Sequence, residues 1–236
     1  MIAAAHGESF PSSPVALHRW SDLLFVHYAL PPQAVRVPPP LELQTYRDQA
    51  WLGVVAFWMP TVRPRWLPRI CGLRFNELNV RTYVTFEGEP GVYFYSLSAD
   101  AKLAVRWARR FWKLPYRDAT IEYDRFGSHR RFCCRRADQT VWDVRFCVSD
   151  QVLAAPTGSM EAFLVERYRL FTLANGTLYT VCVRHVPYPL LAAEAEVLDD
   201  SLACADAAVR ELGAASHVVF SPGVDVEVFA LQRLTT

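Results

Sequence analysis

The part of the sequence best suited to chemistry is a set of four polar residues at alternate positions: Glu77, Asn79, Arg81 and Tyr83. They lie in the stretch FNELNVRTYVTF, residues 75–86. Period-two alternation predicts a strand with these four side chains on one face. A carboxylate on that face can act as a general acid or base, and a guanidinium can bind a carboxylate. The pattern leaves open whether the face meets water or lines a polar cavity.

Three further stretches place polar groups beside apolar runs, and they contain Lys113 with Tyr116, then Glu166, Arg167 and Tyr168, and finally His185. Each group taken singly has a structural explanation, such as an ion pair for Glu77, a core cap for Tyr168 or a backbone hydrogen bond for His185. Taken together they favour a ligand cavity, because ligand clefts combine apolar walls with a few convergent polar groups.

Motifs of known chemistry are absent from the sequence. It has no G-x-G-x-x-G, P-loop, G-x-S-x-G, H-E-x-x-H or C-x-x-C pattern, and its six histidines are scattered. A Ser–His–Asp triad has no local signature here. We therefore predict no metal and no cofactor. The six cysteines are interpreted as buried thiols of a reducing compartment.

Composition narrows the class of protein. The chain has 236 residues, of which 52% are hydrophobic and 21% charged, so it can bury a core. A formal net charge of +1 gives no general attraction to nucleic acid, and residues 125–136 are interpreted as a hairpin with a solvated arginine face. No apolar run approaches the about 20 residues of a membrane span. We expect a cytoplasmic protein without nucleic-acid or membrane partners; a homo-oligomer is left open.

The helices expected from the sequence are few. Residues 99–112 form an amphipathic pattern with Asp100 as its cap. Shorter helices are predicted over residues 159–167, beginning at a serine cap, and over residues 200–212. The apolar stripe expected on the first helix consists of Leu103, Trp107, Ala108 and Phe111.

The remaining pattern is dominated by about ten consecutive strands, the last two over residues 216–220 and 224–231. Residues 1–16 are expected to be a flexible tail, and residues 17–236 a single domain. Consecutive strands with few helices predict a β-rich α+β fold built on an antiparallel sheet or barrel.

Eight segments in order carry a family resemblance: residues 20–30, 38–43, 51–57, 76–84, 90–97, 114–116, 165–168 and 185–190. They resemble the YqjF-like bacterial domain of unknown function, over nearly the whole chain. That family is similar, more distantly, to acetoacetate decarboxylase. The resemblance implies an antiparallel β-barrel-like fold with a central polar cavity and a few helices packed outside.

One departure from the decarboxylase pattern bears on the reaction. The decarboxylase carries two lysines after an aromatic–proline pair, and the first forms a Schiff base. The matching residues here are Tyr116 and Arg117. Arginine stays protonated and tyrosine has no amine, so neither forms an imine. Schiff-base decarboxylation is therefore not expected.

Three functions follow from these residues. In the first, the cavity binds a small organic acid or carbonyl compound, with Arg81 on the carboxylate and Asn79 and Tyr116 as donors. In the second, a lyase- or hydrolase-type enzyme uses Glu77 as general acid or base and Tyr116 as proton donor. In the third, the protein is structural or binds a partner. The other expected ligand-binding residues are Tyr83, Lys113, Arg167, Tyr168 and His185.

Overall fold

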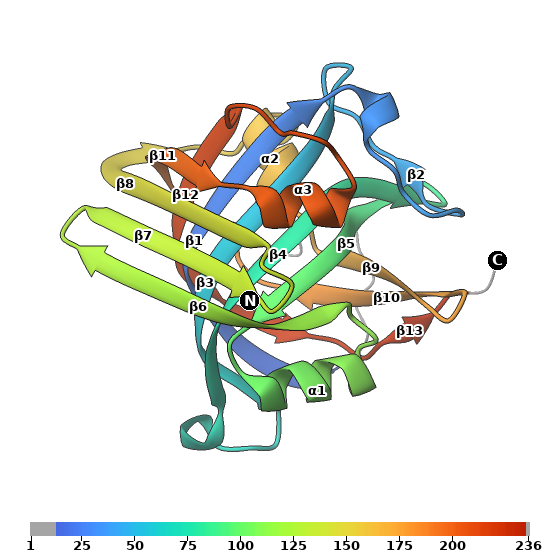
Figure 1. Ribbon diagram of the computed structural model, residues 1–236. Helices are drawn as coiled ribbons and strands as arrows, with labels where there is room; N and C mark the ends of the chain where they lie inside the picture. Colours follow the sequence, from blue (N-terminus) through green and yellow to red (C-terminus); the bar gives the residue numbers. More distant parts are fainter. Residues whose placement is uncertain (1–12, 235–236) are drawn as a thin grey trace.

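A sheet of thirteen strands dominates the described part of this computed structural model, residues 13–234 (Figure 1). The predicted tail therefore lies mostly outside the described residues. The strands are β1 (Ala16–Leu30), β2 (Glu42–Leu43), β3 (Ala50–Pro64), β4 (Leu73–Phe86), β5 (Glu89–Ala99), β6 (Tyr116–Phe126), β7 (His129–Arg136), β8 (Val141–Leu153), β9 (Arg169–Ala174), β10 (Thr177–Arg184), β11 (Leu190–Asp199), β12 (His217–Val228) and β13 (Gln232–Arg233).

The sheet curls until distant strands in its order meet. The order is β13-β10-β9-β5-β6-β7-β8-β11-β12-β1-β3-β4-β2, and additional pairings join β4 to β5 and β10 to β12. Among the described strands all pairings are antiparallel except β5–β6 and β5–β9. The prediction of a mostly stranded fold with few helices is confirmed.

The two faces of β4 are both buried. Leu78 and Val80 belong to an apolar cluster that also contains Leu202 of α3 (Ser201–Ala207). Phe75 belongs to a second cluster inside the curl of the sheet. Because neighbouring residues on a strand point to opposite faces, β4 separates these two clusters. The alternation in residues 75–86 therefore marks two interior faces and no wet surface.

The helix α1 (Lys102–Phe111) lies across the lower end of the sheet in Figure 1, close to β5 and β6. The predicted Asp100 cap is wrong, since Ala101 occupies the cap position without a side-chain bond. Asp100 instead accepts hydrogen bonds from the backbone and side-chain nitrogens of Asn76, at 2.9 and 2.8 Å. Of the expected stripe, Ala108 is buried, whereas Leu103 and Phe111 are more than half exposed.

The remaining helices are short. α2 (Met160–Val165) begins as predicted at Ser159, whose hydroxyl accepts from the backbone N–H of Ala162 at 3.1 Å. α3 ends earlier than predicted, at Ala208 with left-handed backbone. Two single-turn 3₁₀ helices are η1 (Pro32–Ala34) and η2 (Arg69–Cys71). No helix within residues 13–234 is long and apolar enough to span a membrane.

Two sequence interpretations are wrong at the level of elements. The predicted final pair of strands is one strand, β12, because Gly223 adopts a φ of 126° that lets the chain continue beyond Pro222. A Cβ at this position would lie 2.1 Å from the carbonyl oxygen of Trp20, so the close approach requires glycine. The arginine face of residues 125–136 is not wholly solvated, since Arg136 is buried and pairs with Asp206.

Candidate functional site

A cavity of about 680 Å³ lies inside the curl of the sheet, and its wall includes exposed residues such as Trp66 and Leu103. Most of its wall is apolar, with aromatic and aliphatic side chains from β1, β3, β4, β5 and α1. The polar side chains in the wall form a limited set, which consists of His18, Trp20, Arg63, Glu77, Asn79, Arg81, Tyr116, Arg167 and Tyr188. This volume falls within the range of clefts that hold small molecules.

Strand β4 places three of these polar groups in one inward row. Glu77, Asn79 and Arg81 stand opposite Phe57, Val55 and Gly53 of β3, respectively. All three are buried. A Cβ on Gly53 would lie 3.2 Å from Cδ2 of His27 and 3.2 Å from the Tyr83 hydroxyl, so the glycine leaves room for these two side chains beside the row. The row is the one that period-two alternation predicts.

The Glu77 carboxylate meets the Tyr116 hydroxyl inside the cavity. Tyr116 Oη donates to Glu77 Oε2 at 2.5 Å. The contact arises because β4 pairs with β5 at Ala99, and β5 pairs in parallel with the first residues of β6. Burial raises the pKa of Glu77 to about 7, against smaller lowering effects from Tyr116 and Asn79. Burial and the neighbouring carboxylate raise the pKa of Tyr116 well above its ordinary value.

Arg81 is a buried cation without an acidic partner among residues 13–234. Its Nη2 donates to the carbonyl oxygen of Leu164 at 3.0 Å, while its Nε has no hydrogen-bond partner. Its guanidinium carbon lies 5.7 Å from the centre of the Phe25 ring. A buried guanidinium with a spare donor is suited to an incoming anion.

Arg167 brings a second positive charge to the same wall. Burial is the largest cause that lowers its pKa to about 10; the charge of Arg81 acts in the same direction, and Tyr83 opposes the shift. Its Nε donates to the Phe163 carbonyl at 2.7 Å, and its guanidinium stacks near the rings of Phe163 and Tyr83, at 4.4 and 5.3 Å. No carboxylate in the described chain pairs with Arg167.

The neighbouring Glu166 does not neutralise these arginines. Its Oε1 accepts from the backbone N–H of Tyr188 at 2.9 Å, and its Oε2 accepts from the Tyr168 hydroxyl. Burial raises the pKa of Glu166. The net effect is an electropositive region where Arg81 and Arg167 lie close together.

Four expected ligand-binding residues are not in the cavity wall: Tyr83, Lys113, Tyr168 and His185. Tyr83 donates its hydroxyl to the Leu164 carbonyl at 2.8 Å and so holds α2 in place. Lys113 has left-handed backbone with φ 54°, and its carbonyl accepts from Thr172 at 3.0 Å. His185 packs against the Tyr168 and Tyr188 rings, at 4.7 and 4.5 Å.

Sequence reasoning missed the polar residues that β1 and the 186–190 segment contribute. His18 and Trp20 line the cavity, and His18 Nε2 and Trp20 Nε1 are buried without hydrogen-bond partners. Burial lowers the pKa of His18 to about 4, so its imidazole is neutral. Alternation along residues 16–20 was the available signal, because Ala16, His18 and Trp20 all share the inward face.

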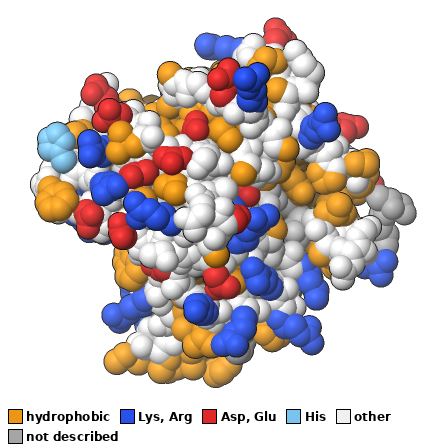
Figure 2. All heavy atoms as spheres, in the orientation of Figure 1, with side chains coloured by type: hydrophobic (Ala, Val, Ile, Leu, Met, Phe, Trp, Pro, Cys, Tyr) orange, Lys and Arg blue, Asp and Glu red, His pale blue; other side chains and the backbone are white. Residues whose placement is uncertain are grey.

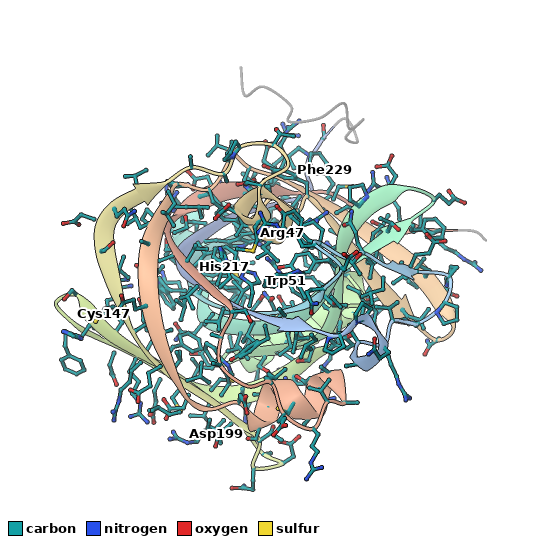
Figure 3. The ribbon with its side chains drawn as sticks, turned by 90° about the horizontal axis from the view of Figure 1, so that it is seen from above. Arg47, Trp51, Cys147, Asp199, His217 and Phe229 are labelled. Carbon is teal, nitrogen blue, oxygen red and sulfur yellow. The ribbon has the colours of Figure 1, made fainter. Side chains whose placement is uncertain are left out.

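The prediction that all six thiols are buried is wrong. Cys71 is exposed and lies in the cavity wall, and Cys147 and Cys204 are partly exposed. Cys147 Sγ lies 2.7 Å from His129 Nδ1 on the outer hairpin. Figure 3 shows Cys147 at the outer edge of the molecule and Trp51 inside the curl of the sheet. Within residues 13–234 no group of three or more metal-ligating side chains is present.

Comparison with solved structures defines the class of fold. Acetoacetate decarboxylase from Legionella pneumophila superposes with a TM-score of 0.68 at 15% identity, over 100% of this chain and 92% of that chain. The enduracididine biosynthesis enzyme MppR complexed with pyruvate gives a TM-score of 0.63 at 16% identity, over 97% and 94%. The fold is therefore acetoacetate-decarboxylase-like.

Sequence comparison gives the family. The family model of the uncharacterized conserved proteins DUF2071 matches residues 18–225. The uncharacterized protein YqjF of Bacillus subtilis strain 168 is 40% identical over 185 residues, which cover 75% of this chain and 76% of that protein. The chain belongs to the DUF2071 family, and the predicted YqjF-like membership is confirmed.

Proposed function

We propose that the protein binds a small organic acid or carbonyl compound in the cavity, with its carboxylate on Arg81 and Arg167. The observation that carries this proposal is that Arg81 and Arg167 line the cavity and have no acidic partner within residues 13–234. An unpaired charge inside a protein is costly, and a bound carboxylate would offset that cost. Asn79, whose Oδ1 lacks a partner, and Tyr116 supply further polar contacts.

Covalent imine chemistry is not part of this proposal. The chain contains two lysines, Lys102 and Lys113, and neither is among the cavity-lining residues. Tyr116 and Arg117 stand where the resemblance to acetoacetate decarboxylase would place the reactive pair. The ligand would therefore be held by charge, hydrogen bonds and apolar contact.

A second candidate function is a lyase- or hydrolase-type reaction with Glu77 as the general acid or base. Its pKa of about 7 supports this candidate, because a group that titrates near neutral pH can both accept and donate a proton. Tyr116, 2.5 Å away, would donate a proton to the substrate. The carboxylate anchored on Arg81 would orient the reacting carbon toward this pair.

Calorimetric titration with matched acids and amides tests the binding proposal. Propionate and pyruvate should bind while propionamide should not, and Arg81→Gln should weaken acid binding at least tenfold. Arg106→Gln, an exposed position on α1, is the control and should bind like the wild type. Acid binding that survives both Arg81→Gln and Arg167→Gln would overturn the proposal.

Turnover separates the two candidates. The wild type and Glu77→Gln should be incubated with each bound acid and followed by proton NMR. An enzyme predicts product formation, or exchange of the proton beside the carbonyl, that Glu77→Gln abolishes without loss of binding. If the wild type binds the acid but does not change it, the result supports a binding protein and contradicts the enzyme candidate.

A further inference from the structure

The polar and apolar parts of the cavity lie at different depths along β4. Arg81 lies below α2, where it donates to the Leu164 carbonyl. Toward the start of the strand come Glu77, Phe75 and Leu73, and the preceding segment adds Leu67 and Cys71 to the wall. Arg81 and Phe75 are six residues apart, about 20 Å at the rise of an antiparallel strand. The opposite end also contains Arg63, whose Nη1 donates to the carbonyl oxygens of Arg65 and Leu67. Apart from this arginine, the wall changes from cationic at depth to mainly apolar at the opposite end.

The apolar end carries hydrophobic side chains that are exposed as well as cavity-lining. They come from α1, the loop between β3 and β4, the start of β4 and the residue before β1. They are Leu103 and Phe111 (56% and 54% exposed), Trp66 (80%), Leu73 (38%) and Val15 (43%). Figure 2 shows hydrophobic side chains gathered along the lower edge, where Figure 1 places the loop between β3 and β4, and Lys and Arg side chains over the region of α1 above it. We call these five residues the apolar rim.

A ligand as small as pyruvate leaves most of this arrangement unused. Contact with the arginines alone occupies the deep end, and the remaining apolar wall would face water. The wall between the two ends includes Phe57, Met59, Val62 and Leu231, all apolar. A site that joins a cationic end to a long apolar wall matches a ligand with the same division.

We propose that the ligand is a carboxylic acid with an extended apolar body, an acyl chain or an arylalkyl group, bound with its tail toward the apolar rim. The proposal rests on the proposed function for the carboxylate end and adds the class of the remainder. The carbon next to the carboxylate then lies nearest the arginines, and the following carbons pass Glu77 and Tyr116.

A chain-length series tests the tail. Straight-chain acids from acetate to decanoate should be titrated calorimetrically into the wild type. Each buried methylene should tighten binding about fourfold until the wall is filled. Affinity that is independent of chain length would overturn this inference and leave the carboxylate proposal standing. Affinity that rises with length but is unchanged in Arg81→Gln would overturn the carboxylate proposal.

A paired substitution on α1 tests where the tail lies. Ala108 is buried and lines the cavity, so Ala108→Phe should fill the space for the tail. It should weaken decanoate binding at least tenfold and leave propionate binding unchanged. Arg106→Phe introduces the same ring at an exposed position outside the wall and should change neither. Equal loss of both acids in Ala108→Phe, or of neither, would contradict the proposed tail position.

Thiol alkylation gives a readout on the unmodified protein. Cys71 is exposed in the cavity wall, whereas Cys147 is partly exposed outside it. Saturating decanoate should slow the alkylation of Cys71 by iodoacetamide at least fivefold, while saturating propionate should not, and Cys147 should react at the same rate throughout. Peptide mass spectrometry measures both sites. Protection of Cys71 by neither acid, or by both equally, would overturn the inference.

Discussion

At the scale of single residues, Glu77 shows how burial prepares a side chain for chemistry. A carboxylate on an open strand would stay ionised at neutral pH. Here desolvation is the largest influence and raises the pKa of Glu77 from its ordinary 4.5 to about 7, while the Tyr116 hydrogen bond opposes the shift without cancelling it. The proton therefore remains on Glu77 over much of the acidic range.

This shift predicts a pH-dependent loss of stability that Glu77→Gln removes. Because the folded pKa lies above the unfolded value, the folded state binds the proton more tightly. Proton binding to Glu77 contributes about 3 kcal/mol to the free energy of unfolding. This contribution is fully present below pH 4.5 and is lost as pH rises through about 7. Urea unfolding of both proteins from pH 4.5 to 8 measures the difference, in which other titrating groups cancel. Parallel stability curves would contradict the prediction.

The buried charge of Arg167 should favour ligand binding but reduce the stability of the ligand-free protein. Burial lowers its pKa to about 10, so its charge is destabilising at neutral pH when no anion is bound. Arg167→Met should raise the free energy of unfolding of the ligand-free protein by about 1 kcal/mol, after loss of the hydrogen bond to Phe163. Chemical denaturation without ligand checks this. A fall in stability would show that the guanidinium already has adequate compensation.

The sequence could predict the inward row of β4 but not the whole site. Alternation places Glu77, Asn79 and Arg81 on one face whatever the tertiary structure. It cannot say that Tyr116 meets Glu77, because that contact depends on the β4–β5 and β5–β6 pairings. It also cannot exclude Lys113, because its left-handed backbone is not predictable from local pattern. A local sequence pattern cannot predict contacts that depend on the pairing of strands distant in the chain.

At the scale of elements, α3 is held to the sheet by a buried ion pair. The Arg136 guanidinium contacts both carboxylate oxygens of Asp206, at 2.7 and 2.8 Å, and also donates to Ser96 and Ser98. Both charged side chains are 3% exposed. The sequence suggested a solvated arginine face on this hairpin, since alternation cannot show which arginine meets a helix from another part of the chain.

Removal of one member of the Arg136–Asp206 ion pair should lower the stability of the protein. Arg136→Met leaves Asp206 buried without its ion pair and should lower the free energy of unfolding by about 3–5 kcal/mol. Arg135→Met is the matched control, because Arg135 pairs with Glu122 at 3.4 Å between side chains that are 46% and 55% exposed. It should cost less than about 1 kcal/mol. Urea denaturation compares them, and equal costs would contradict the anchoring role of the buried pair.

At the scale of the whole molecule, the fold is shared with proteins of very different sequence. The chain shares its fold with acetoacetate decarboxylase at 15% identity. The elements were predictable as a class, because β-branched and aromatic runs with short turns favour consecutive strands. The closure of the sheet was not, since the pairing of β10 with β12 joins segments far apart in the chain. A shared fold does not determine function, which depends on the residues of the site.

Because the cavity lies inside the single sheet that holds the molecule together, a bound acid should stabilise the entire fold. A ligand that binds the folded state alone adds about 2.7 kcal/mol at a hundredfold excess over its Kd. For a chain of 236 residues this corresponds to a rise in Tm of about 5–10 °C. Thermal unfolding with increasing decanoate measures the shift, and Arg81→Gln should show little change at the same concentrations. An equal rise in both proteins would place the acid elsewhere on the molecule.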